Sequence, residues 1–325
     1  MIKSIRMNKE QIDLIVSKIA AANSIAIVGH KNVDPDSLGS VLGLGRLIEL
    51  NFGKKPILIY DGNVPEYMDF FPGRSDMAFA GKLPDGARYD LLFALDIATP
   101  SRQFGDYREK IVGHSDFVIK IDHHQNSEKF GDINIDDDTA GATAEIIFDL
   151  AQTAGWKFDV PAAGLLLAAI IHDTGQFAFA RRGHTLRVAA DLMDAGADME
   201  YLVRELNKST RRHMMAQANI LAAAEFHGNI AIASVFRKDY KNIDGSPHDV
   251  IDMLRRIKSV EYVVIVTEAK DGEVRLSFRS KTRPVNFVAE QFEGGGHRFA
   301  AGGRFFGSMA EAKAAVIKAI KDSAC

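Results

Sequence analysis

Aspartates and histidines recur along this 325-residue chain in four short segments that could together hold metal ions. These are His30-x₃-Asp34-x-Asp36, Asp96, Asp122-His123-His124 and Asp173. Oxygen ligands with some imidazole and no sulfur favour Mn²⁺ or Mg²⁺ over a structural Zn²⁺. Several carboxylates in one crevice would repel one another unless cations neutralised them, so we expect two divalent ions. Such a centre is typical of hydrolases that act on phosphorus esters.

The segment from Asp34 to Asp36 also has a simpler interpretation, because an aspartate in a loop after a strand is most often a helix N-cap. Asp36, directly before Ser37, could serve only that purpose. Pro35 fixes its own φ angle, and we expect the three residues to form a short extended segment. The two carboxylates could then each serve a different ion.

Short apolar runs precede most of these segments and read as buried strands. They are Ser24 to Gly29, Lys55 to Tyr60, Leu91 to Leu95 and Phe117 to Ile121. Helical patterns follow at Ser37 to Asn51, Thr143 to Leu150 and Pro161 to His172. This alternation predicts an α/β fold with a mostly parallel sheet flanked by helices. Because functional groups collect beyond the carboxyl ends of parallel strands, the fold would bring the segments to one rim.

The second half of the chain predicts helices first and then strands. Helical patterns cover 184–195, 199–208 and 211–226, and strand patterns cover 229–236, 262–269 and 273–279. Asp271-Gly272 between the last two strands indicates a hairpin turn. We therefore predict a catalytic metal-binding domain at 1–190, a helical connection at 191–225, and a smaller α/β substrate-binding domain at 226–325.

Composition and charge exclude several classes of partner. A formal net charge of -3 argues against electrostatic binding of duplex DNA. The single cysteine, Cys325, excludes an internal disulfide and a thiolate cluster, which fits a reducing cytoplasm. No stretch approaches the roughly 20 apolar residues that a membrane span needs. Met1 to Ala22 has charges among its apolar positions, which predicts an amphipathic helix and not a secretion signal.

The order of these motifs, followed by Gly294-Gly295-Gly296-His297, resembles the DHH/DHHA1 phosphoesterase family. Within that family the chain looks most like the stand-alone nanoRNase and pAp phosphatase type. The resemblance runs from about His30 to Gly303. It implies an N-terminal DHH domain built on the parallel sheet and a C-terminal DHHA1 domain that binds substrate.

The resemblance also implies two sets of metal ligands that share one bridging aspartate. The first set is His30, Asp34 and Asp96, and the second is Asp36, Asp96, His123 and Asp173. Mn²⁺ is the expected metal, with Mg²⁺ or Co²⁺ as alternatives. His124 corresponds to the catalytic residue of the family, close to the scissile phosphate. It would stabilise charge on the phosphoryl oxygens or protonate the leaving group.

Substrate binding is expected in the second domain. Arg279-Ser280 ends a predicted strand, where a guanidinium and a hydroxyl could grip a phosphate. The glycines of Gly294-Gly295-Gly296-His297 would let the backbone approach a ligand, although three glycines can also mark an ordinary flexible loop. The resemblance implies that both segments bind the nucleotide. Further phosphate contacts could come from Arg102, Arg181-Arg182 and Arg211-Arg212, although solvated surface arginines are at least as common.

The expected enzyme hydrolyses short oligoribonucleotides to mononucleotides, or 3′-phosphoadenosine 5′-phosphate (pAp) to AMP, or both. A phosphodiesterase for cyclic di-AMP or pApA is the first alternative. Gly29-His30-Lys31-Asn32 looks as much like family II pyrophosphatases, which keeps pyrophosphate open as a substrate. A single-strand exonuclease and a nucleotide sensor without turnover are further alternatives. A homodimer is compatible with each of them.

Overall fold

The structure is a computed structural model that describes residues 7–31, 33–100, 104, 107, 111–125, 127–242, 248–270 and 272–323. Contacts within the chain divide it into two compact units, Met1–Lys208 and Ser209–Cys325. The predicted boundaries at 190 and 225 stay a prediction. Within the described ranges, none of the helices is both long enough and apolar enough to cross a membrane.

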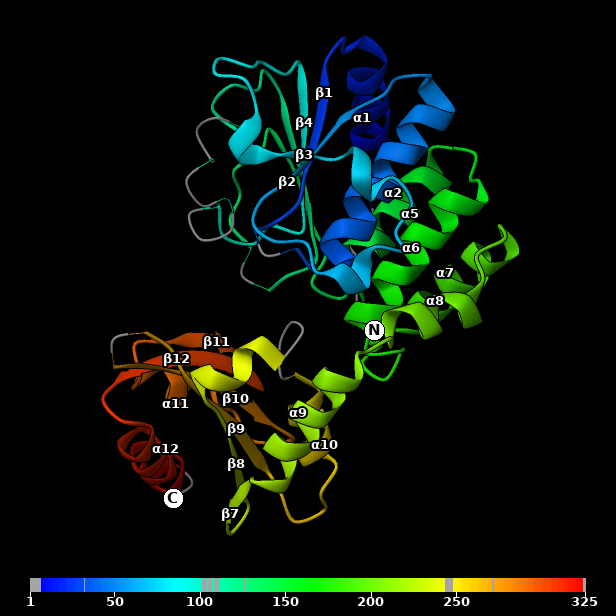
Figure 1. Cartoon of the computed structure of the whole chain (residues 1–325). Coiled ribbons are helices and arrows are strands. Elements are labelled where there is room, and N and C mark those ends of the chain that lie inside the picture. Colours follow the sequence, from blue (N-terminus) through cyan, green and yellow to red (C-terminus); the bar gives the residue numbers. More distant parts are fainter. Residues whose placement is uncertain are drawn as a thin grey trace. The chain divides into compact units, whose positions relative to one another are not determined.

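Unit 1 contains a parallel sheet with the strand order β3-β2-β1-β4-β5-β6 among its described residues (Figure 1). The strands are β1 Ile25–Val28, β2 Ile57–Tyr60, β3 Ala78–Phe79, β4 Leu91–Leu95, β5 Val118–Asp122 and β6 Ile133–Asp136. Val28 of β1 is in register with Ile59 of β2 on one side and with Ala94 of β4 on the other. The predicted mostly parallel sheet is therefore confirmed.

Helices pack on one face of this sheet (Figure 1). They are α1 Lys9–Ala21, α2 Pro35–Phe52, α5 Thr143–Thr153 and α6 Val160–Asp173, followed by α7 Gly183–Asp194 and α8 Met199–Leu206. Their apolar side chains form the main core together with Ile27, Phe93 and Ile121 of the strands. Since strand side chains alternate between faces, the neighbouring residues Val28 and Leu92 belong to a separate cluster with Phe104.

Glycines let α2 approach α6 closely. A Cβ atom on Gly39 would lie 2.6 Å from the carbonyl oxygen of Leu165, and one on Gly43 would lie 2.7 Å from Leu166 Cδ2. At Gly39 an added Cβ atom would push the two backbones apart, whereas at Gly43 a movement of the Leu166 side chain could make room. Asp36 lies in the first turn of α2, and Asp173 is the last residue of α6. The close helix contact therefore fixes the distance between two of the predicted metal ligands.

The segment at the start of α2 corrects one expectation. We predicted an extended stretch from Asp34 to Asp36, but α2 already begins at Pro35. Asp34 is the N-cap, and its side chain accepts a hydrogen bond from the backbone N–H of Ser37 at 2.9 Å. Proline is favoured at the first helical position because its missing N–H needs no partner there. Asp36 is therefore a helical residue and not the cap.

Unit 2 contains a mixed sheet with the order β11-β12-β10-β9-β8-β7 among its described residues. The strands are β7 Glu225–His227, β8 Ile230–Val235, β9 Tyr262–Glu268, β10 Glu273–Ser280, β11 Gly295–His297 and β12 Ala300–Phe306. The pair β8 and β9 is parallel, and the other pairs are antiparallel.

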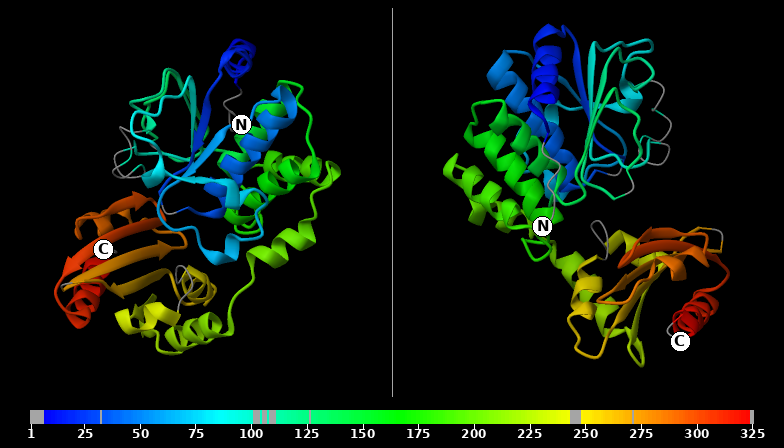
Figure 2. Two further views of the ribbon diagram at one scale, coloured as in Figure 1. Left: turned by 45° about the horizontal axis from the view of Figure 1, so that its top comes forward. Right: turned by 180° about the vertical axis from the view of Figure 1, so that it is seen from behind.

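Helices cover both faces of the sheet in unit 2 (Figure 2). They are α9 Arg211–Ala222, α10 His248–Arg255, α11 Asn286–Glu290 and α12 Met309–Ser323, with a 3₁₀ turn at Arg237–Asn242. Ile220 of α9 packs with Ala231 and Val263 on one face. Val316 of α12 packs with Val264 on the other. The predicted smaller α/β domain is confirmed.

Two local expectations in unit 2 are corrected. The helix predicted to run to Phe226 ends at Ala222, and Phe226 lies in the edge strand β7. The glycine-rich segment that could have been a flexible loop forms the hairpin of β11 and β12. In the expected turn before β10, Gly272 has a φ angle of 76°, as tight hairpin turns require, while Asp271 lies outside the described residues.

Candidate metal centre

Six predicted ligands meet at the carboxyl edge of the parallel sheet in unit 1. His30 follows β1, Asp96 follows β4, His123 follows β5, Asp34 and Asp36 begin α2, and Asp173 ends α6. Ligand atoms lie within 4.8 Å of one another in each of three trios. The trios are His30, Asp34 and Asp96; Asp36, His123 and Asp173; and Asp96, His123 and His124.

The first trio is centred on the imidazole of His30. Its Nε2 lies 3.3 Å from Oδ2 of Asp34 and 3.3 Å from Oδ2 of Asp96. Its Nδ1 lies 2.8 Å from the carbonyl oxygen of Lys31, which can only accept a hydrogen bond. The Nδ1 proton is therefore used by the backbone, and Nε2 is left to face the carboxylates. A metal-binding histidine is commonly held in this way.

The second trio is centred on Nε2 of His123. This atom lies 3.1 Å from Oδ2 of Asp173 and 3.7 Å from Oδ2 of Asp36. It also lies 3.6 Å from Oδ1 of Asp96. Asp173 comes from α6, Asp36 from α2 and Asp96 from the loop after β4, so tertiary packing brings these three carboxylates to His123.

Asp96 lies between the two trios. Its Oδ2 faces His30, while its Oδ1 faces His123 and accepts a hydrogen bond from Thr143 Oγ1 at 3.1 Å. Its backbone has a φ angle of 61°, in the left-handed region that aspartate tolerates better than most residues. A carboxylate with its two oxygens directed at different ligand sets has the geometry of a bridging ligand.

The carboxylate of Asp36 is fully buried and is held by the N-terminus of α5. It accepts hydrogen bonds from the backbone N–H groups of Thr143 at 2.8 Å and Ala144 at 3.2 Å, and from Ser40 Oγ at 3.1 Å. Free N–H groups and the helix dipole make a helix N-terminus favourable for an anion. The sequence did not reveal that Thr143 contacts both Asp36 and Asp96.

The ionisation of these groups fits a cation site. Burial, reinforced by the charges of Asp96, Asp173 and Asp34, raises the pKa of Asp36 well above its usual range. Burial also raises the pKa of Asp173. For His30, burial acts to lower the pKa, but Asp34 and Asp96 raise it to about 12. Protons therefore compensate the crowded negative charge in the bare site, and divalent cations would do the same.

His124 is held by a buried aspartate that our ligand assignment left without a role. Nδ1 of His124 lies 2.8 Å from Oδ1 of Asp122, whose carboxylate is completely buried. Burial acts to lower the pKa of His124, but Asp122, Asp96 and Asp173 raise it to about 9. Nδ1 is also 3.4 Å from Asp96, which places His124 in the third trio. Because Nδ1 is already hydrogen-bonded to Asp122, we do not count His124 as a metal ligand. The third trio shows only that His124 lies next to the metal centre.

The other oxygen of Asp122 belongs to a buried polar network. Ser127 Oγ donates a hydrogen bond to Oδ2, and Nζ of Lys120 lies 3.5 Å from the same atom. Lys120 is fully buried and also pairs with Asp136. Burial acts to raise the pKa of Asp122, but His124, Ser127 and Lys120 lower it. A lysine inside an apolar strand was the available sequence signal, since a buried ammonium requires partners.

The predicted substrate-binding residues lie at one end of the sheet in unit 2. Arg279 of β10 and His297 of β11 are both in register with Ala300 of β12. Burial, reinforced by the charge of Arg255, lowers the pKa of Arg279. The buried Ser280 donates its hydroxyl proton to the carbonyl oxygen of Arg283, so that proton is already used within the unit.

The three predicted glycines serve different purposes. A Cβ atom on Gly294 would lie 2.0 Å from the carbonyl oxygen of Gly302. Gly296 has a φ angle of 144°, and its Cβ would lie 2.7 Å from the Ala300 carbonyl. Around Gly295 there is open space within 4 Å. Backbone packing therefore requires two of the glycines, and Gly295 is the position where a ligand could approach.

The other arginines that could contact phosphate differ in their surroundings. Arg182 lies 2.6 Å from Glu145 Oε1 and 3.0 Å from Asp137 Oδ2, in a buried ion-pair network. Arg181 donates to the carbonyl oxygen of Asp138. Arg211 and Arg212 are exposed at the start of α9. Arg102 lies outside the described residues.

Comparisons with known proteins agree with this arrangement. Residues 24–170 match the DHH family, N-terminal domain, and residues 227–324 match the DHHA1 domain. The chain is 30% identical over 302 residues to a Streptococcus mutans protein named "Probable bifunctional oligoribonuclease and PAP phosphatase NrnA", covering 91% of this chain and 94% of that protein. It is 29% identical to the Thermus thermophilus "Bifunctional oligoribonuclease and PAP phosphatase NrnA", covering 96% and 94%.

A solved structure shows the same fold. It is a Bacteroides fragilis protein described as exopolyphosphatase-related, which superposes with a TM-score of 0.91 at 24% identity and 98% coverage of both chains. The likeness at this identity concerns the fold alone. The sequence matches, together with the assembled aspartates and histidines, show that the chain belongs to the DHH family and carries a DHHA1 domain after its DHH domain.

Proposed function

We propose that this chain is a metal-dependent phosphoesterase that hydrolyses short oligoribonucleotides to mononucleotides and pAp to AMP. The observation that carries the proposal is the position of Asp96, whose two carboxylate oxygens face two separate ligand sets. The names of the Streptococcus and Thermus relatives, which match almost over their whole length, support the choice of substrates.

The proposed ligands form two sets that share Asp96. They are His30, Asp34 and Asp96 for one divalent ion, and Asp36, Asp96, His123 and Asp173 for the other. Mn²⁺ is our first choice, because the donors are mostly carboxylate oxygens with two imidazoles, and Mg²⁺ or Co²⁺ are alternatives. When bound, such a pair of ions activates water and stabilises negative charge on phosphoryl oxygens.

His124 is the proposed catalytic residue. Nδ1 is bonded to Asp122, and the pKa of the imidazole in the metal-free site is raised to about 9, which favours the protonated ring near neutral pH. Its Nε2–H group could then donate a hydrogen bond to a phosphoryl oxygen or a proton to the leaving oxygen. Asp122 would fix the ring orientation, and the contacts to Ser127 and Lys120 would hold Asp122.

The residues that we propose to form the substrate-binding site of unit 2, by contact or by support, are Arg279, Ser280, Gly294, Gly295, Gly296 and His297. Arg279 is the strongest of them, because its guanidinium is a half-buried cation, with its pKa lowered by burial and by the charge of Arg255, that a phosphate would stabilise. Gly295 offers open backbone, whereas Gly294 and Gly296 are needed to keep the hairpin in place. Ser280 would act by holding the Arg283 carbonyl and not by donating to substrate.

The proposal is tested by product analysis with purified full-length protein and Mn²⁺. We expect mononucleotides from a short RNA, AMP and phosphate from pAp, loss of both activities with EDTA, and recovery with Mn²⁺. His124→Ala should still bind nucleotide and lose hydrolysis. Absence of product from both substrates with the metal-loaded protein would refute the proposal.

The same assay ranks the alternative substrates. Rates on pApA, cyclic di-AMP and pyrophosphate, measured beside short RNA and pAp, distinguish a cyclic-dinucleotide phosphodiesterase and a pyrophosphatase from the proposed enzyme. A single-strand exonuclease would prefer long DNA, and a sensor would bind without turnover. The cytoplasmic location and the homodimer stay predictions.

A further inference from the structure

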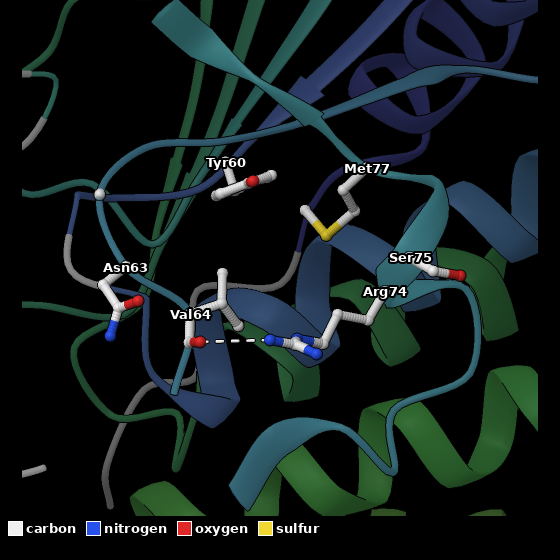
Figure 3. A pocket seen from close by; sticks show the side chains of 7 residues that line it. Tyr60, Asn63, Val64, Arg74, Ser75 and Met77 are labelled. Atoms are coloured by element: carbon white, nitrogen blue, oxygen red, sulfur yellow. Dashed lines mark hydrogen bonds between the residues drawn. The ribbon is translucent and has the colours of Figure 1, made fainter. Parts of the chain in front are cut away.

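A cavity of about 320 Å³ lies in unit 1 outside the proposed metal centre. Its lining includes Tyr60, Asn63, Val64, Arg74, Ser75 and Met77 (Figure 3). Small-molecule sites in proteins usually have about 300–1,000 Å³, so this volume suits one small planar group and not a whole dinucleotide.

The cavity lies at the same edge of the sheet as the metal centre. Tyr60 is the last residue of β2 and directly follows Ile59, which is in register with Val28 of β1. His30 comes two residues after Val28. Because β1 and β2 are parallel neighbours, separated by about 4.8 Å, Tyr60 and His30 leave the sheet side by side. A ligand with its phosphate at the metal centre could therefore place an adjoining group in the cavity.

The walls of the cavity are partly aromatic and apolar. The ring of Tyr60 faces the same space as the side chains of Val64 and Met77 (Figure 3). Phe79 supports this ring from β3, with the centroids 5.6 Å apart and the planes inclined by 44°. A supported aromatic ring beside a thioether is a suitable surface for stacking a flat heterocycle.

Arg74 provides hydrogen-bond donors in the cavity without an excess of positive charge. Its Nη1 pairs with Asp69, and its Nη2 donates to the carbonyl oxygen of Val64 at 3.2 Å. Each of these two terminal nitrogens carries a second N–H group, because a guanidinium has five N–H donors. The pairing with Asp69 neutralises the guanidinium, which disfavours a phosphate. The unused donors favour a neutral ligand with carbonyl or ring-nitrogen acceptors.

We propose that this cavity binds one nucleobase of an oligonucleotide substrate, stacked on Tyr60 and hydrogen-bonded by Arg74. The inference rests on the proposed function, and it adds a base-binding subsite to the metal-containing unit itself. Stacking on an aromatic ring depends little on base identity, so the subsite would suit an enzyme that degrades RNA fragments of any sequence.

The test is a double-mutant-type binding cycle, in which a base is removed from the ligand and the ring of Tyr60 is removed from the protein, each alone and both together. A dinucleotide with a non-hydrolysable methylphosphonate linkage, and its two versions that each lack one base, are titrated into Mn²⁺-loaded full-length protein by calorimetry. For one of the two base positions, we expect removal of the base to weaken binding to the wild type about tenfold. The same removal should have no further effect on Tyr60→Ala, because the interaction is already lost.

Two variants serve as controls. Tyr60→Phe keeps the ring and should bind like the wild type. Phe306→Ala removes an aromatic side chain that is 62% exposed in unit 2 and should leave the effect of base removal at its wild-type size. Met77→Asp changes another wall and should weaken binding in the same base-dependent way if Tyr60→Ala does not fold.

The outcomes separate this inference from the proposed function. If base removal weakens Tyr60→Ala and Met77→Asp as much as the wild type at both positions, the subsite is wrong, whether or not the enzyme cleaves RNA. If the base-dependent coupling appears but no phosphoester is hydrolysed, the subsite stands and the proposed function fails.

Discussion

Nδ1 of His124 lies 2.8 Å from Oδ1 of Asp122, a carboxylate that is fully buried and belongs to neither proposed ligand set. Asp122→Asn would keep the shape of this contact and remove the charge that holds the imidazole protonated. We expect kcat to fall about 10–100-fold, as for other residues that orient a functional histidine. Affinity for Mn²⁺ should change little, which calorimetric titration of the variant would check.

A double variant shows whether Asp122 acts through His124. If it does, Asp122→Asn should cause almost no further loss of kcat in a His124→Ala background. Additive losses would mean that Asp122 acts by another route, such as through Lys120, which lies 3.5 Å from its second oxygen.

Thr143 provides a test of the support around Asp96. Thr143→Val removes the hydroxyl that donates to Asp96 Oδ1 and keeps the backbone N–H that holds Asp36. Because oriented ligands bind metal more tightly, we expect Mn²⁺ affinity to fall about tenfold. Thr153→Val is the matched control, since its hydroxyl donates to the Asp149 carbonyl at the exposed end of the same helix. Equal affinities of the two variants would contradict the assigned role.

Alanine substitutions at two glycines, one in α2 and one in α6, should change the free energy of unfolding in opposite directions. Gly39→Ala places a Cβ atom 2.6 Å from the Leu165 carbonyl, and overpacking of this kind lowers the free energy of unfolding by about 1–3 kcal/mol. In α6, a Cβ atom added to Gly164 would have no atom within 4 Å. Gly164→Ala should therefore raise the free energy of unfolding by about 0.5–1 kcal/mol. Urea denaturation measures both. A Gly39→Ala variant as stable as the wild type would refute the close contact.

The metal-free protein should lose stability as the pH rises. The pKa of His30 is raised to about 12 and that of His124 to about 9, both above the usual value of 6.5. A raised pKa gives stability that is complete below pH 6.5 and is lost as the pH rises toward the folded-state value. We expect the Tm in EDTA to fall between pH 6.5 and pH 9.

Bound metal should offset this loss of stability at high pH, because it displaces the same protons. The stabilisation by Mn²⁺, measured as the difference in Tm from the EDTA sample, should increase with pH over this range. A difference that shrinks with rising pH would show that protons and metal do not compete for these residues.

Much of unit 1 could be predicted because its strands are short apolar runs and its ligands directly follow them. Leu91–Leu95 is such a run, and Asp96 comes next. The sequence could not show how the ligands are supported. Thr143 contacts Asp36 and Asp96 only because α5 points its N-terminus at them, which is a result of helix packing. The role of Asp122 was hidden for a similar reason, because it depends on the contact of Asp122 with the buried Lys120.

In unit 2, the secondary structure of the glycine-rich segment was harder to predict, because it depends on backbone packing and not on a pattern of side chains. Gly294-Gly295-Gly296 has no hydrophobic alternation, yet Gly295 and Gly296 belong to β11 and pair with β12. The strand forms because β12 also presents small residues there, so that two backbones can approach. Close contact between two glycine-rich segments depends on the tertiary structure. The strand propensity of either segment alone does not indicate it.

The strand order of unit 1 has a consequence for how this centre tolerates change. From β1 the chain adds β2 and β3 on one side and then crosses to add β4, β5 and β6 on the other. The order reverses between β1 and β4, which is the position in an open parallel sheet where ligands usually bind. His30 follows β1 and Asp96 follows β4, so the two residues meet at this position. Insertions in loops farther from this position could change the substrates while His30 and Asp96 keep their places.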